Sequence, residues 1–286
     1  MDPIAAAFEE QRSRLFGIAY RMLGSVMEAE DIVQEAWLRF QATAPSGEIQ
    51  STRAWLGAVV TRLCLDQMKS AASRRESYIG PWLPEPLHTE ETPEAAAESA
   101  DSLSMAFLVL LENLTPVERA VFLLREVFDY DYADIAQWID KSEPACRQIF
   151  SRARRYISAH RPRFSAAPEE QAQIFSAFLS AVQLGDLDSL TVLLATDATA
   201  WSDGGGKASA ATRPLHGADA IARFVMGIFR QAPAGFTYEV GPMNHAISLI
   251  ARDPQGHVEV VIIPEISEGR IQALRFIRNP DKLRHV

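Results

Sequence analysis

The stretch GPWLPEPLHTEETPEAAAESADS, residues 80–102, divides this chain more sharply than any other feature of its sequence. Proline lacks an amide hydrogen and clashes with the preceding helical turn, so Pro81, Pro84 and Pro86 exclude a continuous helix here. Residues 81–110 carry six acidic side chains and no Lys or Arg. We therefore expect a linker at 80–105 between two units, and the 286 residues are enough for about two domains.

The overall composition excludes several classes of protein. A net charge of −9 and a pI of 5.2 argue against a uniformly basic nucleic-acid coat and against a polybasic membrane binder. Two cysteines, Cys64 and Cys146, cannot build a disulfide framework or a Cys/His metal cluster, so we expect no metal and no cofactor. The first residues show no basic-then-apolar leader, and no apolar run is long enough to span a bilayer. We expect a cytoplasmic protein without a membrane partner.

Capping signals predict helices on both sides of the linker, in units that we place at 1–79 and 106–163. The third of these helices runs to about Ser73. The signals are Asp2-Pro3, the helix-ending Gly24, Ser25-x-x-Glu28, Ser51 or Thr52, and Thr115-Pro116-x-Glu118.

A different pattern follows the break at 161–168 and defines a third unit, residues 168–286. Two helical patterns over 169–194 and another over 218–231 flank the strand-like ATAWSD. The β-rich runs FTYEV, AISLIA, HVEVVIIP and RIQALRFI come last. Helices first and an antiparallel meander last predict an α+β domain with one curved sheet.

Residues 131–156 fit a helix-turn-helix. The short helix YADIAQWI is followed by the turn DKS and the longer helix EPACRQIFSRARRYI. Asp140 stands where glycine is usual, and aspartate tolerates the left-handed conformation better than most residues. Ser142 can cap the second helix, and Pro144 is tolerated in its first turn.

The second helix separates apolar from basic side chains. Between Ala145 and Arg163 there are six Arg and no acid. Arginine reads guanine bidentately, glutamine reads adenine, and arginine also binds phosphate. The alternative is a solvated basic face on an ordinary helix. The apolar face holds Cys146, Ile149, Phe150, Ala153 and Ile157, and the polar face holds Arg147, Gln148, Ser151, Arg152, Arg154 and Arg155.

The N-terminal unit offers a second kind of surface. In AEDIVQEAWLRF, an acidic face with an exposed Leu38 lies opposite the apolar face of Val33, Ala36, Trp37 and Phe40. This face suits a basic partner with an apolar pocket, although a solvated face with one stray leucine fits the pattern equally well. The third helix ends in basic residues, which also suit the helix dipole.

Together these residues resemble the extracytoplasmic-function sigma factors. AEDIVQEAWLRF is similar to the segment that contacts the polymerase clamp, and RAWLGAVVTRLCLDQMKS with the following RR is similar to the segment that melts and reads the −10 element. LTPVERAVFLLREVFDYDYADIAQWIDKSEPACRQIFSRARR is similar to the −35 reader. The resemblance covers residues 5–160 and implies a promoter-specificity subunit of bacterial RNA polymerase.

The remainder resembles the subgroup of these sigma factors with a fused SnoaL-like domain, which is similar to polyketide cyclases and ketosteroid isomerases. Three motifs carry this resemblance: WLPEPL at 82–87, DGGGK at 203–207 and NPDKL at 279–283. It implies a cone-shaped α+β domain that regulates the sigma factor in place of a separate anti-sigma protein.

The resemblance assigns roles to four sets of residues. Those expected to enter the −35 major groove are Glu143, Arg147, Gln148, Ser151, Arg152 and Arg155. Those expected at the −10 element are Arg62, Asp66, Lys69, Arg74 and Arg75. Those expected to dock on the polymerase core are Asp31, Gln34, Glu35 and Leu38. Those expected to join linker and fused domain are Trp82, Leu83, Pro84, Leu87, Asp203, Gly204, Gly205, Gly206, Lys207, Asn279, Pro280, Asp281, Lys282 and Leu283.

The physical basis for the last set is that WLPEPL is stiff and apolar, while DGGGK permits a close approach to another surface. We expect Trp82, Leu83 and Leu87 to anchor the fused domain, which would clasp the linker and the first helical unit. The alternative is a flexible hairpin loop and a turn in the tail. The acidic residues Glu90, Glu91 and Glu94 suggest a linker that mimics nucleic acid in the polymerase channel.

The fused domain also raises the question of a ligand or a reaction. Its fold encloses a pocket, for which we expect a regulatory small molecule rather than catalysis. A general acid–base pair would need two polar groups in one cavity, and the sequence shows no such pair. Two other classes stay open: a ligand-sensing repressor, and a cyclase or isomerase with an accessory DNA-binding unit. The polar candidates for catalysis are Trp201, Asp203, Tyr238, His245 and Glu259.

Overall fold

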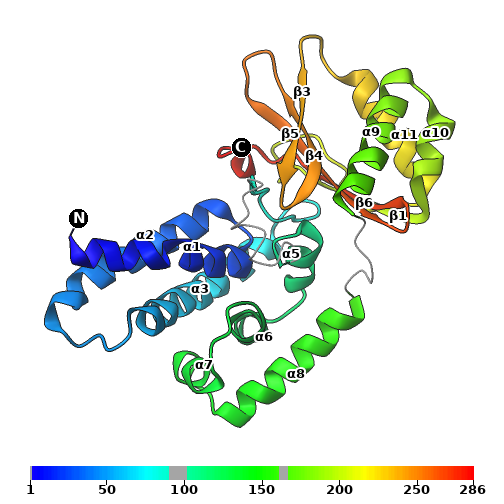
Figure 1. Ribbon diagram of the computed structural model, residues 1–286. Helices are drawn as coiled ribbons and strands as arrows, with labels where there is room; N and C mark the ends of the chain where they lie inside the picture. The colour runs from blue at the N-terminus through cyan, green and yellow to red at the C-terminus, as the bar shows by residue number, and fades with distance from the viewer. Residues whose placement is uncertain (1, 90–101, 161–166) are drawn as a thin grey trace. The chain divides into compact units, whose positions relative to one another are not determined.

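The computed structural model of the chain describes residues 2–89, 102–160 and 167–286, together with the backbone but not the side chains of 71–76. It divides into two compact units (Figure 1). One comprises Met1–Ser77 and Phe107–Arg161, and the other comprises Tyr78–Ala106 and Pro162–Val286. The described part of the predicted linker therefore clusters with the C-terminal residues, and both predicted helical units fall into the first compact unit.

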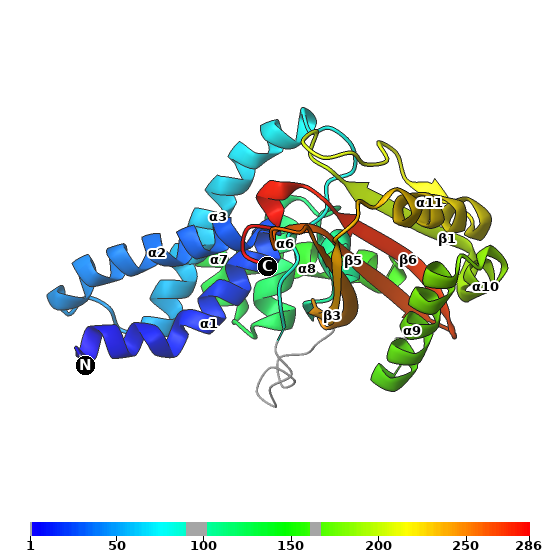
Figure 2. The same ribbon diagram turned by 90° about the horizontal axis from the view of Figure 1, so that it is seen from above.

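The first unit is helical. The caps form as predicted: Asp2 accepts from the amide of Ile4, and Gly24 is left-handed with φ 69°. The Ser25 hydroxyl accepts from the amide of Glu28. Helices α1 and α2 run side by side (Figure 2). The elements are α1 (Pro3–Leu23), α2 (Val26–Thr43), η1 (Ala44–Ser46), α3 (Thr52–Glu76), α5 (Met105–Leu111, which reaches the unit boundary), α6 (Pro116–Phe122), the π-helical turn η3 (Leu123–Val127), α7 (Tyr132–Trp138) and α8 (Glu143–His160).

Contacts between α1, α3 and the 128–138 region hold this unit together. Arg14 lies 4.8 Å from the ring of Tyr130 and donates to the carbonyl of Phe128. A Cβ on Gly57 would lie 2.8 Å from the Trp138 ring, so only glycine lets α3 approach α7 this closely. The buried Arg119 of α6 donates to the carbonyl of Met22 at the end of α1.

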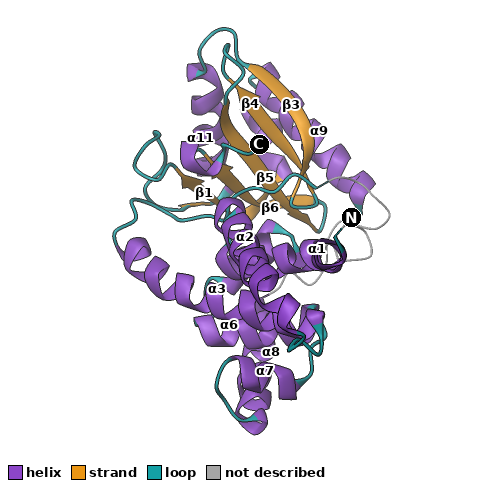
Figure 3. Ribbon diagram, turned by 90° about the vertical axis from the view of Figure 1, so that its left-hand side faces the viewer, coloured by secondary structure: helices purple, strands orange, loops and turns teal. Residues whose placement is uncertain are grey.

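The second unit is built on one six-stranded sheet in the order β2-β1-β6-β5-β4-β3 (Figure 3). The strands from β3 to β6 form the predicted antiparallel meander. Strand β1 pairs in parallel with β6, which the sequence pattern does not predict, and this pairing makes the sheet mixed. The elements are α9 (Pro168–Leu184), α10 (Leu187–Leu193), β1 (Leu194–Asp203), β2 (Leu215–His216), α11 (Ala218–Gln231), β3 (Thr237–Met243), β4 (Ala246–Arg252), β5 (Val258–Ser267), β6 (Arg270–Ile277) and η4 (Pro280–Lys282).

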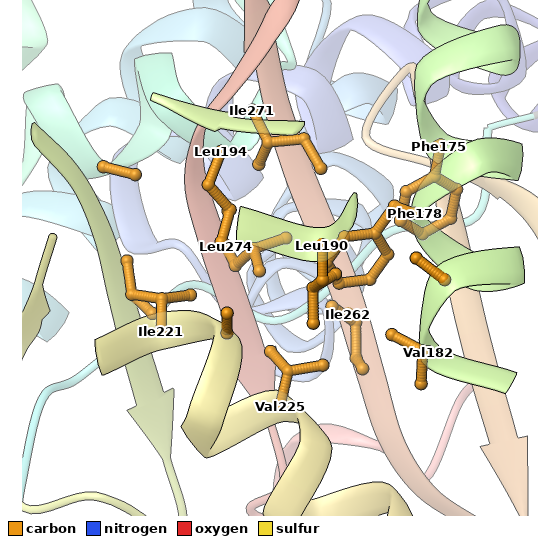
Figure 4. Packing of buried hydrophobic residues seen from close by; sticks show 14 of the residues in the cluster. Phe175, Phe178, Val182, Leu190, Leu194, Ile221, Val225, Ile262, Ile271 and Leu274 are labelled. Carbon is orange, nitrogen blue, oxygen red and sulfur yellow. The ribbon is translucent and has the colours of Figure 1, made fainter. Parts of the chain in front are cut away.

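One face of the sheet packs against α9, α10 and α11 to form a hydrophobic core. Phe175 and Phe178 of α9 stack with their ring centroids 5.8 Å apart, in one cluster with Ile262 and Leu274 of the sheet (Figure 4). Val225 of α11 is fully buried in the same cluster. Layers of helices on one face of a sheet match the predicted α+β class.

Three observations on the described residues concern their helices, their cysteines and their possible metal ligands. None of the described helices is long and apolar enough to cross a membrane. Cys64 and Cys146 are free and buried. No three His, Cys, Asp or Glu side chains in the described part of the chain gather closely enough to hold a metal ion.

The capping box that opens α6 yields a stability prediction. The Thr115 hydroxyl accepts from the amide of Glu118, whose carboxylate accepts in turn from the amide and hydroxyl of Thr115. Thr115→Ala should lower the free energy of unfolding by about 1 kcal/mol, because it leaves a helix-terminal amide without its acceptor. Thr115→Ser keeps the hydroxyl and serves as control. Urea unfolding of the full chain followed by circular dichroism measures both, and equal midpoints for the two variants would contradict the prediction.

Candidate functional site

The helix-turn-helix forms as predicted from α7 and α8. Asp140 is left-handed with φ 54°, which accounts for the turn without glycine. The Ser142 carbonyl accepts from the amide of Cys146 in the first turn of α8. Cys146, Ala153 and Ile157 are buried, as their apolar face requires.

The polar face of α8 is open to solvent. Arg147, Gln148, Ser151, Arg152 and Arg155 are exposed, and Glu143 is half-buried at the start of the helix. These six residues therefore share one accessible surface, which we call the α8 face.

Carboxylates partly compensate the charge of the α8 face. Arg147 pairs with Glu143 at 2.7 Å and lies 4.5 Å from the ring of Tyr132. Arg152 lies 3.7 Å from a carboxylate oxygen of Glu118. Both arginines are exposed, so these pairs are weak, and phosphate or base edges can replace the carboxylates at small cost.

The predicted polymerase-binding residues gather on one face of α2. Asp31, Gln34 and Leu38 are exposed, and Leu38 has 53% of its surface accessible. Glu35 forms a 2.7 Å ion pair with Arg39 along the helix. This α2 face combines acidic groups with an exposed apolar side chain.

The predicted −10 residues on α3 are not all equally available. Arg62 donates to the carbonyls of Trp138 at 3.2 Å and Gln137 at 3.4 Å, so it binds the end of α7. Asp66 and Lys69 form an exposed ion pair at 2.8 Å. The side chains of Arg74 and Arg75 lie outside the described residues, as do Glu90, Glu91 and Glu94 of the linker.

The predicted linker–domain residues meet around the carboxylate of Asp203, at the end of β1. Asp203 is fully buried and accepts from the Tyr78 hydroxyl at 2.6 Å and the Leu83 amide at 2.8 Å. Its own loop adds the amide of Gly205 at 3.1 Å. Lys282 supplies the compensating charge at 2.8 Å. We call this arrangement the Asp203 junction.

Lys282 binds the linker as well as Asp203. The residue is 6% exposed, and its ammonium group donates to the carbonyl of Leu83 and lies 4.0 Å from the centre of the Trp82 ring. A buried cation needs such a set of partners, because its desolvation is otherwise unfavourable. The Lys282 side chain thus ties NPDKL, WLPEPL and Asp203 into one contact.

The glycines of DGGGK allow the loop to approach its neighbours. A Cβ on Gly205, which has φ 57°, would lie 2.3 Å from the side-chain nitrogen of Asn279. Asn279 in turn donates to the Tyr78 hydroxyl at 2.9 Å. Burial, and after it the hydrogen bond to Asp203, raise the pKa of Tyr78 well above its ordinary value, which keeps the phenol a donor to the carboxylate. Lys207 and Asp281 form a more exposed ion pair beside the junction.

A second set of contacts holds the rest of the linker. The amide of Leu87 donates to the Asn244 side chain at 3.0 Å, and the amide of Asn244 donates back to the Leu87 carbonyl at 2.8 Å. Asn244 also donates to the carbonyl of Leu103, on the far side of the acidic stretch. Both ends of the linker therefore bind the second unit. His285 completes the set with a 2.7 Å contact to the carbonyl of Pro86.

Several of these residues were absent from the sequence prediction. Tyr78 and Asn244 lie outside the three motifs, and nothing in the sequence pairs them with Asp203 or Leu87. Asn244 and His245 both have positive φ, 51° and 58°, at the hairpin between β3 and β4. Asparagine is common at such positions, and that is the one signal that could have drawn attention to Asn244.

Only some of the candidates for catalysis share a cavity among the described residues. Tyr238 and Glu259 line a pocket of about 540 Å³ between α11 and the sheet, whereas Trp201, Asp203 and His245 are not among its lining residues. Asp203 is engaged in the junction, and the His245 amide donates to Thr89 of the linker. The pocket wall therefore brings together two of the five polar candidates.

Comparisons with known proteins agree with this geometry. The family model described as Sigma-70 region 2 matches residues 7–74, and the model described as Sigma-70, region 4 matches residues 104–157. The chain is 38% identical to ECF RNA polymerase sigma factor SigJ of Mycobacterium tuberculosis, over 96% of this chain and 91% of that protein. It is 39% identical to the probable ECF sigma factor SigI of the same organism, over 68% of this chain and 67% of that one.

A solved structure extends the likeness to the fused domain. The crystal structure of M. tuberculosis SigJ superposes with a TM-score of 0.77 at 33% identity and covers 97% of each chain. The likeness thus includes the helical units and the SnoaL-like α+β domain. With two family models in the expected order and a relative matched over nearly its whole length, this chain belongs to the extracytoplasmic-function RNA polymerase sigma factors.

Proposed function

We propose that the fused domain restrains this sigma factor by holding the linker between its two promoter-reading parts at the Asp203 junction. The observation that carries the proposal is the buried Asp203–Lys282 pair, which binds Tyr78, just before the linker, and Trp82 and Leu83 within it. No separate anti-sigma protein is needed in this scheme, because the restraint belongs to the chain itself.

The length of the linker explains why holding it matters. The −35 and −10 elements lie about 25 base pairs apart, which is roughly 85 Å of duplex at about 3.4 Å per base pair. The 28 residues between Glu76 and Met105 can span at most roughly 95 Å when fully extended. A linker bound at both Tyr78 and Leu103 cannot extend so far. Release of the linker would then be a condition for reading both elements at once.

The contacts within the first unit favour the same interpretation. Sigma factors bind the polymerase core and promoter DNA, and Arg62 is expected to face the melted −10 strand. In the free chain Arg62 instead binds carbonyls of α7, next to the −35 reader. Binding to polymerase and promoter would therefore shift a population from the closed to the extended arrangement.

We further propose that the α8 face reads the −35 major groove and that the α2 face docks on the polymerase core. Exposure of five of the six α8 residues and three of the four α2 residues supports these roles. Tyr238 and Glu259 line one pocket, and we propose a regulatory rather than a catalytic role for that pocket.

The junction is tested by Lys282→Met in the full chain. Removing one partner of a buried ion pair costs about 3–5 kcal/mol, so the linker should detach from the second unit. Promoter-specific run-off transcription with purified core polymerase at limiting sigma factor should then rise about tenfold or more, since 1.4 kcal/mol corresponds to a factor of ten. Point variants are preferable to truncation after residue 165, which would leave the buried Leu83 without its cover.

Lys207→Met is the matched control for that experiment. It removes the same charge from the neighbouring Lys207–Asp281 pair, whose side chains are 55% and 39% exposed. An exposed pair contributes less than about 1 kcal/mol, so transcription should stay close to that of the wild type. A fall in transcription with Lys282→Met, or equal effects of both variants, would contradict restraint by the junction.

The −35 assignment is tested by Arg152→Ala. If Arg152 reads a base, the affinity of the holoenzyme for a promoter selected from a random duplex pool should drop by about 1–3 kcal/mol, and selectivity at one position should relax. Fluorescence anisotropy of labelled duplexes measures both quantities. Arg223→Ala, which removes an exposed, ion-paired arginine from α11, is the control. An equal loss of affinity for all duplexes would indicate that Arg152 contacts phosphate and does not read a base.

The α2 face is tested by Leu38→Ala. Burial of its 53% exposed side chain in a polymerase pocket contributes about 1 kcal/mol, so the Kd for core polymerase should increase about fivefold. Leu184→Ala removes a still more exposed leucine from α9 and should leave that Kd unchanged. Biolayer interferometry against immobilised core enzyme compares the two variants. An unchanged Kd for Leu38→Ala would favour the solvated-face interpretation of α2.

A further inference from the structure

The cavity of the second unit has the size and lining of a small-molecule site. Its volume of about 540 Å³ lies within the range of about 300–1,000 Å³ that is usual for ligand pockets. Aromatic and aliphatic side chains form most of its wall, from α11, the following loop and the sheet. The apolar lining includes Phe224, Ile228, Phe229, Phe236, Leu249 and Phe276.

The described residues that line this largely apolar cavity include the cationic side chain of Arg278. Arg278, directly after β6, lines the cavity and uses Nη1 to donate to the carbonyl of Ser209. Its Nε is buried and has no hydrogen-bond partner among the described residues. Nε itself is too enclosed to reach the cavity, so a ligand would meet the part of the guanidinium that lines it. Among the described residues no carboxylate pairs with Arg278, so its charge favours an anionic oxygen, which forms a stronger hydrogen bond than a neutral one.

Two of the segments that line the cavity lie next to the Asp203 junction. Arg278 precedes Asn279 of NPDKL, and its amide donates to the carbonyl of Asp203 at 2.7 Å. Ser209 and Ala210, also in the wall, follow DGGGK by two and three residues. A molecule bound to Arg278 would therefore touch both loops that hold the linker.

We propose that this cavity binds an apolar ring-bearing molecule with one anionic oxygen group, held by Arg278, and that its binding stabilises the Asp203 junction. The regulatory part of this inference rests on the proposed function, whereas the binding site does not. Glu259, which also lines the cavity, opposes an anion and thereby limits the affinity.

Two dyes with the same rings test the ligand class on the full chain. 1-Anilinonaphthalene-8-sulfonate carries one sulfonate, and N-phenyl-1-naphthylamine is its uncharged counterpart. Fluorescence titration should show that Arg278→Gln raises the Kd of the sulfonate dye about tenfold. The Kd of the neutral dye should stay within twofold of its wild-type value. Glu259→Gln should lower the Kd of the sulfonate dye, because it removes a negative charge from the cavity wall. Equal effects of Arg278→Gln on both dyes would overturn the role of Arg278.

A cavity-filling variant tests where the dyes bind. Gly227 of α11 lines the cavity, and a Cβ built there meets no atom within 4 Å. Gly227→Leu should occupy the cavity and suit the helix, because leucine has the higher helix propensity. The variant should no longer bind either dye, while its melting temperature should stay at the wild-type value. Unchanged dye binding in folded Gly227→Leu would place the dyes elsewhere and overturn the site.

Hydrogen exchange tests the link to the junction without transcription. The amides of Leu83 and Gly205 donate to the Asp203 carboxylate, so their exchange reports the closed junction. Their exchange should slow when the sulfonate dye binds the wild type, but not in Gly227→Leu. Unchanged exchange in the dye-bound wild type would overturn the link. This readout is separate from the transcription assay of Lys282→Met, so failure of the proposed restraint and failure of the ligand site give different results.

Discussion

The buried carboxylate of Asp203 is the constraint on which the rest of the second unit depends. An ionised carboxylate out of water is strongly unfavourable unless cations and hydrogen-bond donors surround it. Its donors come from distant parts of the chain: Tyr78 and Leu83 of the linker, Gly205 of its own loop and Lys282 near the C-terminus. Loss of any one donor makes the buried carboxylate less stable and so weakens the contacts that the other donors make with it. The three motifs are therefore parts of one electrostatic unit rather than separate turns.

The structure also depends on two places where the backbone comes very close to a neighbouring side chain. At Gly205 a side chain would collide with Asn279, and at Gly57 it would collide with Trp138. Each glycine thus permits one packing contact, the first in the Asp203 junction and the second between α3 and α7. Neither contact could be maintained with alanine unless the neighbouring side chain moved.

Local chemistry made much of the fold and of the candidate site predictable. Caps such as Asp2 and Thr115 act within a few residues, and the β-rich apolar runs of 246–277 are separated by Gly, Pro and Asp, so both were visible in the sequence. The left-handed Asp140 was expected for the same reason. The partners Tyr78 and Asn244 were not, because a hydrogen bond between residues more than 100 positions apart leaves no local pattern.

The parallel pairing of β1 with β6, which local patterns also could not show, explains why the motifs meet. Parallel neighbours end at the same edge of a sheet, and the register sets Asp203 opposite Ile277. The loop after β1 is DGGGK and the segment after β6 is Arg278 followed by NPDKL, so both emerge side by side. An antiparallel pairing would have sent them to opposite edges and left Asp203 without Lys282. The same pairing places Ser209 within reach of Arg278, and so a single topological choice builds both the junction and the polar end of the cavity.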